Sequence, residues 1–163
     1  MITLKNIVVR LEAISAAHPK INQFGFGEQT DLQAYTLQYP YFWVSTESPH
    51  RIVYSPDNKF QSIEFQFTLR VCDKVTWGTN PLSEVGEESN NGLDALSDTF
   101  QILREILNAI MMDTKSIFTD LELIDDILVD PLLHADGADV NGHEAIITLR
   151  TKNDSKCIST ITD

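Results

Sequence analysis

The sequence is short of basic residues. Its 163 residues include 12 Lys and Arg against 24 Asp and Glu, which gives a formal net charge of -12 at pH 7. Proteins that bind nucleic acids use Lys and Arg to displace the counterions condensed on phosphates, and an acidic surface repels phosphates. We therefore expect no sequence-specific binding of DNA or RNA. The charge still suits a non-adhesive wall along which DNA slides.

Cysteines and long apolar runs are also scarce. Cys72 and Cys157 lie far apart and form no CxxC pair, so they indicate reduced thiols and neither a disulfide framework nor a zinc site. Residues 1–6 lack the features of a secretory signal, and no run approaches the roughly 18 apolar residues of a membrane span. We expect a protein of the cytosol, or of a particle assembled there, with no membrane partner.

Motifs for catalysis and for cofactor binding are missing as well. The 4 histidines show no metal-ligand spacing, and neither GxSxG nor GxxxxGK[ST] occurs. Asp136, Asp139 and Asn141 resemble part of a calcium loop. However, placing Gly142 at the invariant glycine of that loop puts Thr148 where the bidentate glutamate should be. We expect no enzyme, and we assign no catalytic residue, metal or cofactor.

Two amphipathic helices are expected in one domain, since compact domains run from roughly 50 to 250 residues. The domain should cover residues 1–151, followed by a polar C-terminal tail at 152–163. Thr3 can cap a first helix that ends at Pro19, and a second helix should start near Asn91 with Asp94 in its first turn. The apolar stripes expected on these helices are Leu4, Ile7, Val8, Leu11 and Ile14, and Leu93, Leu96, Phe100, Leu103, Leu107 and Ile110.

Alternation of apolar and polar side chains predicts the strands. The clearest case is residues 63–72, where one face should be buried and the other solvated. This strand could run from Phe60 to Val75 and project in part as a hairpin arm. Further strands are expected at 32–37, 39–45, 118–124, 127–133 and 144–151.

Glycine and other turn residues predict the connections. We interpret residues 21–27 as a loop, Asn141-Gly142 as turn residues, and residues 77–91 as a long acidic loop. The order of elements then predicts an α+β fold. It should have an antiparallel or mixed β-sheet, two amphipathic helices packed on one face, and a long β-hairpin arm.

The aromatic residues exceed what one small core usually absorbs. Core packing and a subunit interface are equally good interpretations, because buried faces and interface faces look alike in sequence. Under the second interpretation, the residues of the oligomer or partner interface are Phe24, Phe26, Tyr39, Tyr41, Trp43, Val75 and Trp77.

The layout of helices and strands resembles that of the tail-terminator and tail-completion proteins of tailed bacteriophages, over nearly the whole chain. More narrowly, HPKINQFGFG at 18–27 and YPYFWV at 39–44 are similar to segments of neck or tail proteins in crAss-like phages. The resemblance implies a structural virion protein of the head–tail junction or tail, assembled in the cytoplasm of a bacterial host.

The same resemblance implies a homo-oligomeric ring, hexameric in terminators or twelvefold near a portal. Its partners would be other copies of the chain, portal, neck or tail-tube proteins, and genomic DNA that passes through the lumen without sequence-specific contacts. The family offers no catalytic residues to carry over. The alternatives are a head–tail adaptor or other neck ring protein, and a non-viral cytosolic protein-binding module, which should be monomeric and have a ligand groove.

Overall fold

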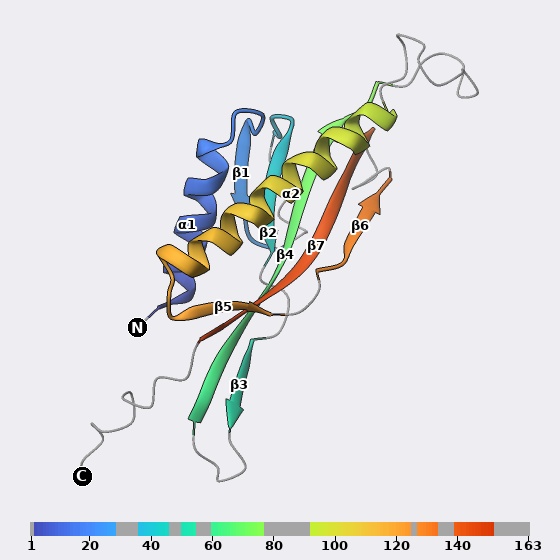
Figure 1. The fold of residues 1–163 in the computed structure, drawn as a ribbon. Coiled ribbons are helices and arrows are strands. Elements are labelled where there is room, and N and C mark those ends of the chain that lie inside the picture. The colour runs from blue at the N-terminus through green and yellow to red at the C-terminus, as the bar shows by residue number, and fades with distance from the viewer. Residues whose placement is uncertain are drawn as a thin grey trace.

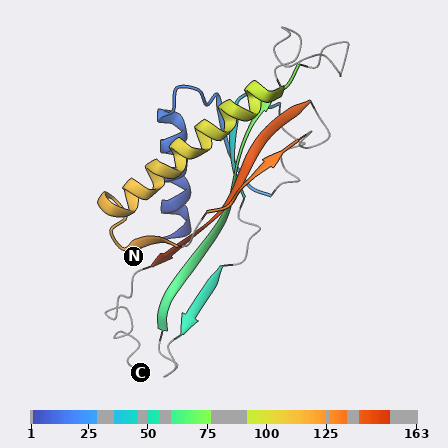
Figure 2. The same cartoon turned by 45° about the vertical axis from the view of Figure 1, so that its right-hand side comes forward.

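The computed structural model describes residues 2–28, 36–45, 50–54, 60–76, 92–124, 127–133 and 139–151. These residues form a mixed sheet of 7 strands with two helices on one face (Figure 1). The turned view in Figure 2 shows the same arrangement, with both helices on one side of the sheet. The predicted α+β fold is therefore confirmed.

Helix α1 spans Leu4–Ala17 and begins at the predicted cap. The backbone N–H of Asn6 donates to Oγ1 of Thr3 at 3.2 Å, and the Asn6 side chain accepts from the N–H of Thr3 at 3.0 Å. The helix ends just before His18 and Pro19, whose ring cannot be placed in a helix interior. The whole predicted apolar face contacts the core, with Ile7 and Leu11 fully buried, so this helix was predicted correctly.

Helix α2 spans Gly92–Ser116, with Asp94 in its first turn as predicted. Its predicted apolar stripe was partly wrong, because Leu93 and Phe100 are exposed. Leu103 and Ile110 are buried as predicted, and the buried residues that the stripe did not include are, among others, Ala95, Thr99, Ile102 and Ile106. Thr99 can take an inward position because its hydroxyl donates to the carbonyl of Ala95 at 2.7 Å.

The centre of the sheet consists of β4 (Phe60–Lys74) and β7 (Val140–Thr151), which pair antiparallel from Glu64 to Lys74. As predicted, the apolar side chains of β4 alternate, and those that face the helices are buried: Phe65, Phe67, Leu69 and Val71. The opposite face was expected to be solvated, and this was only partly correct. Arg70 and Cys72 on that face are buried.

Shorter strands flank this pair. One side of β4 pairs with β2 (Tyr41–Ser45) and β3 (Arg51–Tyr54), and the far side of β7 pairs with β5 (Leu121–Ile124) and β6 (Val129–Leu132). Strand β1 (Gln23–Phe26) pairs with β2 in parallel, which makes the sheet mixed. Helix α2 packs on β4 and β7, and α1 packs on β1 and α2.

Two glycine-containing segments were predicted wrongly. The expected loop at 21–27 contains β1, and the expected turn residues Asn141 and Gly142 lie inside β7. In both cases the glycine permits a close approach between strands. A Cβ at Gly25 would lie 2.2 Å from Cε3 of Trp43, and a Cβ at Gly142 would lie 2.2 Å from the carbonyl oxygen of Val71.

Strand β3 and residues 60–64 of β4 form a two-stranded segment, which we call the β3–β4 ribbon. Figure 1 shows this ribbon extending away from the part of the sheet that the helices cover. The predicted hairpin arm, as a device that contacts other subunits, stays a prediction. The predicted acidic loop at 77–91 and the polar tail at 152–163 lie outside the described residues.

Candidate interface surfaces

The sheet face opposite the helices carries a second apolar cluster. Its buried members are Tyr41, Trp43, Cys72 and Val140, and three half-buried residues pack against them: Leu37, Tyr39 and Leu132. This cluster covers one end of the face. It absorbs several of the aromatic residues that looked surplus in the sequence.

The residues predicted to form an interface are therefore divided between core and surface. Tyr41, Trp43 and Val75 have exposed fractions of 1%, 4% and 2%, so in this conformation they pack within their own subunit. Their assignment to an interface was made because buried and interface aromatics share one sequence pattern. Only a rearrangement of the subunit would bring these three side chains to a partner.

The other four predicted interface residues differ in position. Phe24 and Tyr39 are half-buried, and the ring of Phe24 lies 5.8 Å from that of Phe42 in the main core. Phe26 on β1 is 44% exposed and keeps much of its ring available. Trp77 lies outside the described residues. An interface role for these residues stays a prediction.

Exposed apolar side chains also occur where the sequence interpretation named none. Ile52 and Tyr54 on β3 are each 59% exposed, and Leu93, Phe100 and Met112 are exposed on α2. The spacing of Ile52 and Tyr54, two residues apart in a β-branched and aromatic run, was a signal available in the sequence. In a regular strand this spacing places both side chains on one face, although the pairing of β3 with β4 shifts register between Val53 and Tyr54.

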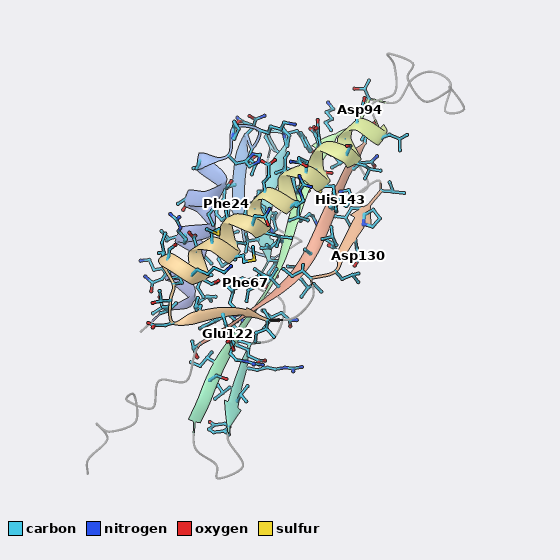
Figure 3. The ribbon with its side chains drawn as sticks, in the orientation of Figure 1. Phe24, Phe67, Asp94, Glu122, Asp130 and His143 are labelled. Carbon is cyan, nitrogen blue, oxygen red and sulfur yellow. The ribbon has the colours of Figure 1, made fainter. Side chains whose placement is uncertain are left out.

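The helix-free face also carries ion pairs that cross the strands. Arg150 on β7 donates to Oε1 of Glu64 on β4, at 2.9 Å from Nε and 2.6 Å from Nη2, and its Nη1 lies 3.6 Å from Oε1 of Glu122 on β5. Arg70 pairs with Glu144 at 3.0 Å. Carboxylates therefore offset the positive charge of both guanidinium groups. Figure 3 shows Glu122 on β5, just above the ribbon in that view.

Polar contacts also join α2 to the segment that follows α1. His18 Nε2 lies 3.0 Å from a carboxylate oxygen of Glu105, and Lys20 Nζ donates to Asp98 at 2.9 Å. The pKa of Glu105 is lowered, first by a hydrogen bond from Gln101 and then by the one to His18. These contacts fix α2 against the N-terminal part of the chain.

Two titratable groups lie at the interface between α2 and the sheet. The ring of His143 is buried, and burial lowers its pKa. The pKa of Asp73 on β4 is raised, mainly by burial and also by the charge of Asp98, while a hydrogen bond from the N–H of Lys74 opposes the rise. Neither group has a catalytic partner set around it among the contacts that the structure describes.

The described residues contain neither a cluster of metal ligands nor a membrane-spanning helix. Within the described segments, no group of three or more His, Cys, Asp or Glu side chains could hold a metal ion. Neither α1 nor α2 is long and apolar enough to cross a membrane. Comparison with protein-family models and with curated proteins finds no match to this chain.

Proposed function

We propose that this chain is a structural virion protein of a tailed bacteriophage that forms a homo-oligomeric ring at the head–tail junction, as a tail-terminator or tail-completion subunit. The observation that carries the proposal is the β3–β4 ribbon. It extends from the helix-covered sheet, and β4 is the one described strand with which β3 pairs. Two-stranded ribbons are marginally stable in water on their own, so packing against another surface would stabilise this one.

The side chains of the ribbon support an interface. Ile52 and Tyr54 present large apolar surfaces to solvent, and such exposed groups gather where proteins contact partners. If every copy places its ribbon on a different surface of the next copy, the contacts run head to tail. Head-to-tail contacts of this kind close into a ring when the rotation between copies permits it.

The charge of the chain suits a ring through which DNA passes. A net charge of -12 favours a lumen that repels phosphates, and Arg70 and Arg150 are already paired with carboxylates. Portal, neck or tail-tube proteins would dock on the two ends of the ring. A head–tail adaptor or other neck ring needs the same subunit contacts and differs in its position in the virion.

Paired serine substitutions in the ribbon test the proposal. Sedimentation velocity should show that the unmodified chain forms a higher oligomer and that Ile52→Ser with Tyr54→Ser shifts it to monomers. Met112→Ser is the matched control, because Met112 is 58% exposed and lies on α2, away from the ribbon. If the ribbon and control substitutions shifted the oligomer to monomers equally, the ribbon would no longer support the proposed ring.

A further inference from the structure

Polar contacts hold the first turns of α2 on the sheet. Oγ1 of Thr99 lies 3.0 Å from Nδ1 of His143 on β7, and the amide of Asn141 lies 3.4 Å from the carbonyl oxygen of Gly92. The ring of Phe100 meets that of His143 edge-on, with their centroids 5.4 Å apart. Figure 3 shows His143 beneath this half of α2, near the end marked by Asp94.

The hydrogen bonds of Thr99 define the protonation of the imidazole. Its hydroxyl has one proton, and the close contact at 2.7 Å with the carbonyl of Ala95 requires that proton. The hydroxyl oxygen therefore accepts from His143, so Nδ1 carries a hydrogen. The neutral ring then has its unprotonated nitrogen at Nε2, which is where an added proton would bind.

The rest of α2 is held differently. Ile102, Ile106 and Ile110 are buried in the main apolar core against β4 and β7. Apolar contacts do not respond to protonation, whereas a charge on the buried imidazole would have to be desolvated. The polar contacts of this half bring Glu105 to His18 and Asp113 to Arg10, so a proton on His18 would not oppose its packing, whereas a proton on His143 would oppose the packing of the first half.

Among the residues that the structure describes, the nearest charged groups do not stabilise an imidazolium at this position. Asp130 and Glu144 are cross-strand partners on the helix-free face, away from the ring, and Asp98 on α2 is bonded to Lys20. Asp73 faces the helices, but it lies opposite Asn141, two pairs along the strands from His143.

The side chains that oppose the ring are uncharged. They are Val71 on β4 and Pro131 on β6, with Thr99 and Phe100 on α2. Burial is the cause of the lowered pKa of His143, and none of the charged groups in the described segments offsets it.

We propose that His143 is a pH-sensitive latch: protonation of its ring releases residues 92–100 of α2 from β7, while the remainder of the helix stays packed. In the released state the imidazole is solvated and titrates near its ordinary pKa of about 6.5. Acid therefore favours release at pH values below about 6.5 and above the lowered pKa of His143 in the packed state. By linkage, the opening equilibrium grows by at most about tenfold per pH unit in this interval. This latch is independent of the proposed ring function.

Hydrogen exchange of the full chain from pH 7.5 to 5.0 tests the latch. After correction for intrinsic exchange rates, peptides from 92–100 should lose protection by up to about tenfold per pH unit below about pH 6.5, while peptides from 103–110 keep theirs. His143→Gln should make the protection of 92–100 independent of pH. His18→Gln is the matched control and should leave the pH dependence in place.

A second measurement covers the case in which His143→Gln does not fold. In the unmodified chain, the ring protons of His143 should titrate by NMR in step with the amide shifts of residues 95–100. The latch is overturned if both halves of α2 lose protection in parallel. It is equally overturned if the pH dependence survives in His143→Gln, or if the ring titrates without any change in those amides.

Discussion

Arg10 on α1 and Asp113 on α2 form an ion pair with two hydrogen bonds, Nε to Oδ2 at 2.7 Å and Nη2 to Oδ1 at 3.0 Å. The side chain of Asp113 is only 10% exposed, while that of Arg10 is 37% exposed. The hydrogen bond to Asp113 also raises the pKa of Arg10. The pair thus joins two helices that are distant in sequence, and it supplies the partner that a nearly buried carboxylate needs.

Removal of this partner should destabilise the fold. We expect Arg10→Met to lower the free energy of unfolding by about 1–3 kcal/mol, because it leaves the carboxylate of Asp113 desolvated without a donor. Urea denaturation measures the loss. Asp98→Asn is the control, since the pair of Asp98 with Lys20 is exposed on both sides and should contribute less than about 1 kcal/mol. Losses of equal size would show that the burial of Asp113 does not matter.

The contact between Gly25 and Trp43 should show coupling in a double-mutant cycle. Gly25→Ala places a methyl group against the buried indole and should cost about 1–3 kcal/mol of stability. In a Trp43→Leu background the same substitution should cost much less, because the ring atoms that it meets are gone. Thermal unfolding of the four proteins measures the coupling. Additive losses would contradict the close packing of β1 on β2.

The raised pKa of Asp73 predicts a pH-dependent effect of Asp73→Asn. The folded state binds the proton more tightly than the unfolded state, so ionised Asp73 destabilises the fold above its folded pKa. The substitution should therefore raise the unfolding midpoint at pH 7. Asn still offers an oxygen to the N–H of Lys74. As pH falls through the raised pKa toward the ordinary value near 3.8, the advantage should shrink. If the gain in the unfolding midpoint stayed constant with pH, it would not arise from the raised pKa of Asp73.

The sequence predicted the elements that local patterns determine. The cap at Thr3 and the alternation at 63–72 each depend on neighbouring residues, and α1 and β4 follow from them. The face of α2 was harder to predict. Thr99 is inward because it bonds to its own helix and to His143, and that long-range contact has no signature in hydrophobic periodicity.

Long-range packing also explains the other differences. Strand β1 exists because it pairs in parallel with β2, so Gly25 marks a close approach and no turn. Tyr41 and Trp43 were assigned to an interface, but they belong to the second cluster, whose other buried members, Cys72 and Val140, come from β4 and β7. The exposed pair Ile52 and Tyr54 could have been found from its spacing alone.

The mass of the unmodified chain in solution tests the central claim most directly. Light scattering across a concentration series should be made at two ionic strengths, because salt screens the repulsion between acidic subunits. We predict a species with six or twelve times the 18.4 kDa mass of the subunit, favoured at the higher ionic strength. A monomer at every concentration and at both ionic strengths would contradict self-assembly into a ring.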